Sequence, residues 1–142
     1  MFLIDTNVVS ELRKLSDGRA DRAVVAWFAA VEEGSLHLSV VTLMELELGI
    51  ARLDRRDPVQ ADMLRRWLQH HVRPAFAERV LPITSEIASR CALLRDPDPR
   101  PQQDAWLAAT ALVHGLGIVT RNVADFANTG VAISNPWEHR PA

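Results

Sequence analysis

Four positions in the sequence place a carboxylate where a charged group is unusual. Asp5 and Asp125 follow apolar runs, and Asp104 begins the apolar stripe of a predicted helix. Either Glu45 or Glu47 is the fourth, inside a predicted helix that is apolar around most of its circumference. Carboxylates that converge without compensation raise one another's pKa, so such a cluster implies held protons or bound cations.

The chemistry of such a cluster depends on the ion it selects. Oxygen ligands favour Mg²⁺ or Mn²⁺ over zinc. One or two of these ions can orient a water and neutralise charge in an in-line attack at phosphorus. Polar neighbours suited to support the acids or to contact a phosphate are Thr6, Thr120 and Asn122, with Arg121 and Arg95 as candidate backbone contacts.

The first acid depends on a predicted strand at residues 2–4. Phe2-Leu3-Ile4 has no polar interruption, which is typical of a strand buried on both faces of a parallel sheet. Asp5 then stands at the carboxyl end of that strand, where open α/β sheets bind ligands. We expect Thr6 or Asn7 to cap the following helix. The alternative is that Asp5 itself only caps the helix or closes a turn.

The glutamates lie in a predicted helix from about Val41 to Leu53, which Ser39 can cap. A buried carboxylate is costly unless it is paired, hydrogen-bonded or bound to a cation. Periodicity does not choose between Glu45 and Glu47, and a salt bridge to an arginine is the simple explanation for either.

Asp104 lies one turn before the apolar stripe of the helix that follows the proline-rich loop 96–101. Its alternative role is a favourable charge at the helix N-terminus. The strand predicted at 116–120 ends in Thr120-Arg121-Asn122, with Asp125 shortly after, which repeats the pattern of the opening. With further strands expected around 36–38, 80–83 and 131–134, the chain is predicted to be α/β with a parallel sheet.

Composition excludes several classes of protein. The 142 residues fit one domain, with 48% hydrophobic and 24% charged residues. A net charge of −2 argues against binding nucleic acid through overall charge. No apolar run approaches the roughly 18 residues of a membrane span, so we expect a cytoplasmic protein without a membrane partner. Cys91, the only cysteine, is expected to be buried. The chain carries no phosphate-binding glycine loop, nucleophile elbow or zinc pattern.

The sequence resembles the PIN-domain family and, within it, the FitB-like branch of the VapC toxins. The resemblance covers the whole chain in the order of the family's motifs. It rests on the segments 2–12 (FLIDTNVVSEL), 39–49 (SVVTLMELELG), 104–111 (DAWLAATA), 120–126 (TRNVADF) and 135–137 (NPW).

This resemblance implies a single three-layer α/β/α PIN-like domain over residues 1–142, with a central parallel sheet. It implies a Mg²⁺- or Mn²⁺-dependent endoribonuclease that acts as the toxin of a type II toxin–antitoxin system. The implied partners are RNA, a VapB-like antitoxin over the active-site groove, and a second copy of the chain in a homodimer. Metal binding and catalysis are assigned to Asp5, Glu45, Asp104 and Asp125, which selects Glu45 over Glu47.

The sequence departs from the family pattern in the loop before Asp104, where Arg100-Pro101-Gln102-Gln103 lacks the expected glycine. Two other functions remain as alternatives. One is a phosphohydrolase with Asp5 as nucleophile, which is weakened by Asn7 at the position of the usual second aspartate. The other is a catalytically inactive PIN module that binds RNA or protein.

Overall fold

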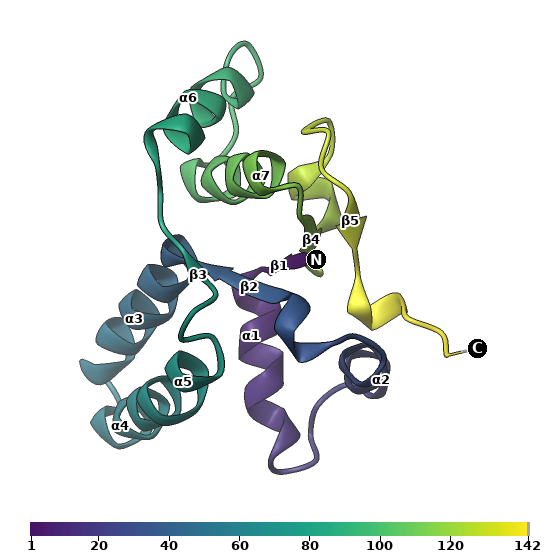
Figure 1. The fold of residues 1–142 in the computed structure, drawn as a ribbon. Helices are drawn as coiled ribbons and strands as arrows, with labels where there is room; N and C mark the ends of the chain where they lie inside the picture. The colour runs from purple at the N-terminus through teal and green to yellow at the C-terminus, as the bar shows by residue number, and fades with distance from the viewer. Residues whose placement is uncertain (142) are drawn as a thin grey trace.

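A five-stranded parallel sheet separates two helical layers in the computed structural model, which describes residues 1–141 (Figure 1). The strand order is β3-β2-β1-β4-β5, and every neighbouring pair is parallel. The predicted α/β/α fold is thereby confirmed. The strands are β1 (Phe2–Ile4), β2 (Leu36–Ser39), β3 (Val80–Leu81), β4 (Gly117–Val119) and β5 (Ile133–Ser134).

Helices connect the strands as the parallel topology requires. They are α1 (Thr6–Leu12), α2 (Arg22–Ala30), α3 (Val40–Asp54), α4 (Pro58–Trp67), α5 (Arg73–Ala75), α6 (Ser85–Leu94) and α7 (Gln102–His114). A π-helical turn, Leu68–Val72, joins α4 to α5, and 3₁₀ turns occupy Arg13–Leu15, Glu33–Ser35, Val123–Phe126 and Pro136–Glu138. The turn Val123–Phe126 is called η4 below.

The two faces of β1 pack into different cores, because successive strand residues point to opposite sides of the sheet. Ile4 packs with α1, α2, α3 and α4 through Val8, Trp27 and other buried side chains. Leu3 packs on the other face, where Leu107, Ala108 and Ala111 bring α7 close to the sheet. The strand is therefore buried on both faces, as its uninterrupted apolar sequence predicts.

Several predicted helix ends are confirmed, and one is wrong. Ser39 caps α3 by accepting the Val41 N–H at 3.0 Å, and Gly115 ends α7 with a φ of 68°. Neither Thr6 nor Asn7 caps α1. Asp5 does so, because its backbone is still extended (φ −75°, ψ 158°) and its side chain accepts the Thr6 N–H. The capping role proposed as the alternative for Asp5 is real, and it does not exclude a second role.

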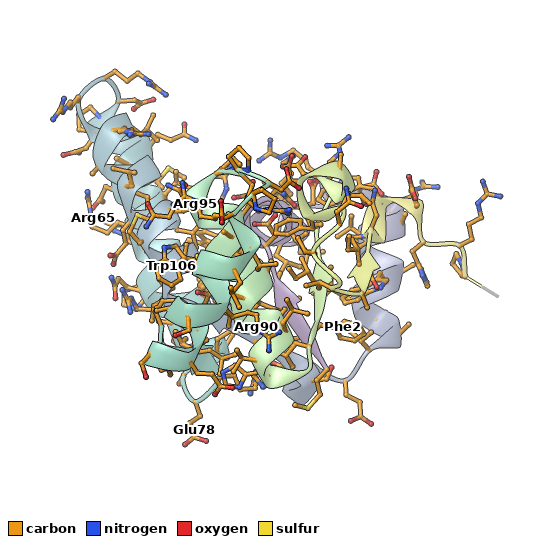
Figure 2. The ribbon with its side chains drawn as sticks, turned by 90° about the horizontal axis from the view of Figure 1, so that it is seen from above. Phe2, Arg65, Glu78, Arg90, Arg95 and Trp106 are labelled. Carbon is orange, nitrogen blue, oxygen red and sulfur yellow. The ribbon has the colours of Figure 1, made fainter. Side chains whose placement is uncertain are left out.

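Helices α3 and α4 form a hairpin that projects beyond the body of the molecule (Figure 2). The labelled Arg65 lies on this hairpin, and Trp106 of α7 lies on the side of that helix nearest α3. Cys91 is buried in α6, as predicted. Across residues 1–141, the helices are all too short or too polar to span a bilayer.

Candidate active site

Asp5 lies at the carboxyl end of the central strand, where the order of the sheet reverses between β2 and β4. Its side chain is only 9% exposed and accepts three hydrogen bonds. The Thr6 N–H donates to Oδ1 at 2.7 Å, while the Thr120 hydroxyl and the Asn7 amide donate to Oδ2 at 2.8 and 3.1 Å. These donors fix the carboxylate and favour its ionised form.

Hydrogen bonds connect the residues that follow β1 to those that follow β4 at this edge of the sheet. The Asn7 side chain donates to the Thr120 hydroxyl at 3.3 Å and accepts the Arg121 N–H at 3.2 Å. The Asn122 N–H also donates to the Thr120 hydroxyl, at 3.0 Å. Thr120 is fully buried and therefore joins the two strand ends through one oxygen. The sequence pattern indicated Asn7 as a capping candidate and did not predict this bridging contact.

The two glutamates of α3 lie in different surroundings. Glu45 faces the strand ends, where its Oε1 accepts the Thr6 hydroxyl at 3.2 Å. Glu47 points away and pairs with Arg73, with 2.6 Å between a guanidinium nitrogen and Oε1. The salt bridge considered for either glutamate thus explains Glu47, and Glu45 is the one that lies with Asp5.

Asp104 and Asp125 reach the same place from two other elements. Asp104 lies in the first turn of α7, and Asp125 lies in η4, which the buried Phe126 anchors to the core. Burial, together with the negative charges of Asp125 and Asp5, raises the pKa of Asp104 to about 6 against the opposing effect of the Arg100 guanidinium. Such coupling between carboxylates requires that they lie close together.

The pKa values of the other two acids respond to the same neighbours. Burial raises the pKa of Asp5 against the opposing hydrogen bonds, and the Asp125 charge adds to the rise. Burial also raises the pKa of Glu45, with contributions from the charges of Asp5 and Asp104. The structure therefore brings all four predicted acids into one electrostatically coupled group.

This group has no ion pair within the described part of the chain. Nor do any three acidic, histidine or cysteine side chains of residues 1–141 form a ready-made cage for a metal ion. The four carboxylates thus have no ion-pairing partner to offset their mutual repulsion within this part of the chain.

A groove of about 580 Å³ leads away from the acids between α1, α3 and α4. Thr6, Asn7 and Glu45 line it near the acids. The cationic and aromatic residues that line the groove are Arg13, Lys14, Arg56, Trp67, Arg121 and Trp137.

Trp137 is a residue of this groove to which sequence analysis gave no role. The Arg121 guanidinium lies over its ring at 5.0 Å from the centroid, and Asn135 orients it by accepting the Trp137 N–H. The Asn-Pro-Trp segment was the only signal in the sequence. Arg95, proposed as a backbone contact, instead donates to the Arg100 carbonyl at 3.3 Å.

Comparison with known proteins identifies a matching family and similar proteins. The model of the PIN domain matches residues 2–131. The chain is 36% identical over 143 residues to VapC ribonuclease Y4jK of Sinorhizobium fredii, covering 97% of this chain and 99% of the relative. It is 35% identical over 143 residues to toxin FitB of Neisseria gonorrhoeae, covering 96% and 99%.

Solved structures agree with the sequence relatives. The crystal structure of FitAcB from Neisseria gonorrhoeae superposes with a TM-score of 0.86 at 33% identity, covering 97% of this chain and 99% of that one. A structure of FitAB bound to an IR36 DNA fragment also gives a TM-score of 0.86, at 30% identity and 99% coverage of both chains. The chain belongs to the PIN-domain family.

Proposed function

We propose that this chain is a Mg²⁺- or Mn²⁺-dependent endoribonuclease that acts as the toxin of a type II toxin–antitoxin pair. The observation that carries the proposal is the coupled group of Asp5, Glu45, Asp104 and Asp125 at one edge of the sheet, without an ion pair within residues 1–141. The names of the relatives, a VapC ribonuclease and a toxin, support it.

The donor set fits a hard divalent ion. All four proposed ligands are carboxylates, which Mg²⁺ and Mn²⁺ prefer. Asp5 accepts three hydrogen bonds, and because an ionised carboxylate has about four acceptor sites, one remains for an ion. Mg²⁺ usually keeps several waters, so it need not contact every acid directly. When bound, such an ion activates a water and neutralises charge on phosphate oxygens.

The protein's own polar groups hold the acids for this task. Thr6 connects two of them, because its N–H donates to Asp5 and its hydroxyl donates to Glu45. Thr120 and Asn7 favour the ionised form of Asp5 and orient it from the other side. Thr6, Thr120, Asn122 and Arg121 are therefore proposed as supporting or phosphate-contacting residues, as expected from the sequence.

The lining of the groove is better suited to binding RNA than the net charge of the whole chain suggests. Arg13, Arg56 and Arg121 line it without an ion pair inside residues 1–141, whereas Lys14 is paired with Glu11 at 3.3 Å. These arginines offer phosphate contacts along a path that ends at the acids. Trp67 and Trp137 offer rings on which unpaired bases can stack. Because RNA is the substrate, we place the activity in the cytoplasm.

The same groove is the proposed docking site of a VapB-like antitoxin. Solved relatives are complexes named FitAcB and FitAB, in which the toxin carries a partner. A segment that fills the groove next to Glu45 and Arg121 would exclude RNA from the acids. An antitoxin peptide is therefore expected to compete with RNA for binding.

A homodimer is the proposed assembly. Val40, Met44 and Leu48 recur every fourth residue on one face of α3 and remain 38%, 44% and 39% exposed. Beside them lies an open hollow of about 330 Å³ that Trp106 lines. An exposed apolar stripe of this kind is typical of an interface, and the family resemblance favours a second copy as its occupant.

Cleavage of an end-labelled single-stranded RNA tests the proposed function. We expect internal cleavage by the wild-type protein in Mg²⁺, none in EDTA, and restoration by Mn²⁺. The Asp5→Asn variant should cleave at least about 100-fold more slowly, because a ligand to the ion is weakened. Wild-type cleavage by Asp5→Asn in Mg²⁺ would contradict the proposal.

Neither alternative from the sequence gains support from the site. A nucleophilic Asp5 gains no support, because Asn7 stands where such a phosphatase carries its second aspartate, and the Asn7 amide is used to bridge Asp5 and Thr120. A module that only binds RNA gives no reason for four coupled acids, whose mutual repulsion disfavours both folding and phosphate binding.

A further inference from the structure

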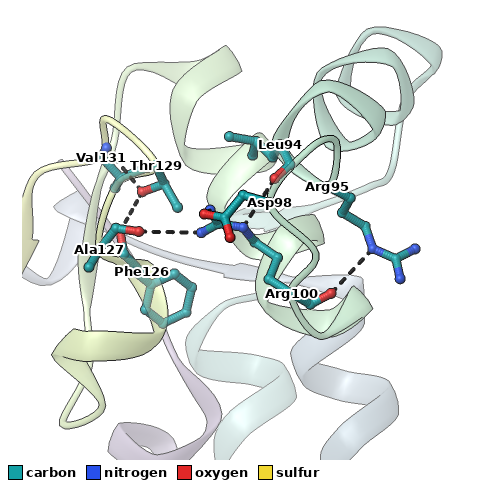
Figure 3. Close-up of polar contacts among 8 residues, drawn as sticks. All are labelled: Leu94, Arg95, Asp98, Arg100, Phe126, Ala127, Thr129 and Val131. Atoms are coloured by element: carbon teal, nitrogen blue, oxygen red, sulfur yellow. Dashed lines mark hydrogen bonds and ion pairs between the residues drawn. The ribbon is translucent and has the colours of Figure 1, made fainter.

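Arg100 connects the end of α6 and the loop that follows it to the distant segment after η4 (Figure 3). Its Nε donates to the Leu94 carbonyl at the end of α6 at 3.1 Å, and a terminal nitrogen donates to the Ala127 carbonyl after η4 at 3.4 Å. The second terminal nitrogen pairs with Asp98 in the intervening loop at 3.0 Å. All three guanidinium nitrogens are thus used.

The side chain of Arg100 is 10% exposed, whereas that of its acidic partner Asp98 is 66% exposed. The guanidinium therefore lies inside the junction, and the ion pair forms only its outer edge. A planar group with donors in fixed directions can bond these three acceptors together, which the point charge of a lysine cannot reproduce.

Two of the proposed ligands flank this junction. Asp104 begins α7 four residues after Arg100, and Asp125 lies two residues before Ala127 in η4. The far side of η4 is held independently, because the Thr129 hydroxyl donates to the Phe126 carbonyl at 2.6 Å (Figure 3). The bond from Arg100 to Ala127 is therefore a direct polar connection between the segment that carries Asp104 and the one that carries Asp125.

We infer that Arg100 is a positioning residue that sets the separation of the Asp104 and Asp125 carboxylates, and hence the binding of the divalent ion. The identity of the ion in this inference rests on the proposed function. Arg100 itself lies outside the group of four acids. Its sequence signal was the loop Arg100-Pro101-Gln102-Gln103, where the family resemblance led us to expect a glycine.

The chain offers a matched control at the opposite edge of the sheet. Arg79 also joins two backbone segments, donating to the Leu36 carbonyl at 2.8 Å and to the Ala75 carbonyl at 2.6 Å. Leu36 begins β2, so this junction lies at the amino end of the strands, away from the acids. Arg79→Lys should lower stability without changing the acid group.

The test compares Arg100→Lys, Arg79→Lys and Asp98→Asn with the wild type. Titration calorimetry with Mn²⁺ alone gives the metal affinity, and RNA kinetics at saturating metal separate kcat from KM. For Arg100→Lys we expect Mn²⁺ affinity and kcat to fall at least about tenfold, as is typical when the support of a metal ligand is lost, while KM stays within about twofold. Asp98→Asn keeps both carbonyl bonds and should stay within about threefold.

A merely structural role would give a different result. Arg100→Lys and Arg79→Lys would then lose thermal stability alike, with Mn²⁺ affinity and kcat unchanged in both at a temperature where they remain folded. That result would overturn the inference. If the wild type binds Mn²⁺ but cleaves no RNA, the proposed function fails, and the Mn²⁺ titrations still decide the role of Arg100.

Discussion

The four acids at the carboxyl edge of the sheet contrast with five acids elsewhere that have a basic partner. Elsewhere in residues 1–141, five acids have a basic partner within ion-pairing distance, and these pairs are Glu11–Lys14, Asp17–Arg19, Glu47–Arg73, Asp62–Arg66 and Asp98–Arg100. At the sheet edge, four acids lie together and repel one another. Exposed pairs add little stability, so the contrast is informative mainly about the unpaired group.

Glu45 and Glu47 reduce this contrast to two residues of one helix. Both are carried by α3, and they differ in that Glu45 meets the hydroxyl of Thr6 whereas Glu47 meets the guanidinium of Arg73. The partner of each glutamate, and not the burial of the helix alone, therefore separates an acid in an ion pair from one that lies with other acids.

The largest expected effect comes from making the same substitution at Glu45 and at Glu47. Glu45→Gln should reduce RNA cleavage at least about 100-fold, because it removes a charge from the proposed metal site. Glu47→Gln should stay within about twofold, because its pair with Arg73 is exposed and weak. Rates at saturating Mg²⁺ provide the measurement. Equal losses in the two variants would show that Glu45 has no special role.

A smaller effect is expected from removing the Thr120 hydroxyl, which donates a hydrogen bond to Asp5. Thr120→Val removes the 2.8 Å bond to Asp5 and leaves the Asn122 N–H without its acceptor, whereas Thr120→Ser keeps the hydroxyl. We expect kcat to be at least about tenfold lower for the valine variant, in line with about 1.5–3 kcal/mol for a hydrogen bond to a charged group. The serine variant should recover most of the rate. Failure of serine to do so would indicate that packing of the methyl group matters instead.

The smallest effect concerns stability without metal. Because the pKa of Asp104 is raised to about 6, the folded protein holds a proton that the unfolded chain releases near pH 4. Stability should therefore fall as pH rises through this window and remain lower above pH 6. In EDTA at pH 7.5, Asp104→Asn should be more stable than the wild type by about 1 kcal/mol after discounting for solvent screening.

Urea unfolding at several pH values checks this prediction. The advantage of Asp104→Asn should shrink towards pH 4, where the wild-type carboxyl is protonated in the folded state and only partly ionised in the unfolded one. A constant difference between pH 4 and 7.5 would mean that the pKa of Asp104 is not raised in the folded protein.

The sequence was sufficient for features that depend on local position. Asp5 and Asp125 follow buried strands and Asp104 starts a helix, and parallel strands bring their carboxyl ends to one edge wherever they form. The same reasoning predicted the five strands and most of the helix ends. It erred at Asp5, because a residue that ends a strand with extended backbone can cap the next helix without an intervening residue.

Features that depend on distant partners could not be predicted from local pattern. The choice of Glu45 over Glu47 required the family resemblance, because Arg73 lies 26 residues from Glu47. The contacts of Arg100 depend on how the loop brings Leu94 and Ala127 to one point. The groove, likewise, forms only when α4 and the segment of Trp137 pack beside α1.

Crystals soaked in Mn²⁺ test the central claim most directly. An anomalous difference map records the ion itself, independently of any assay with RNA. We predict a peak among the carboxylates of Asp5, Glu45, Asp104 and Asp125, and its loss in crystals of Glu45→Gln. An ion bound elsewhere, or none at a concentration that supports cleavage, would contradict the account.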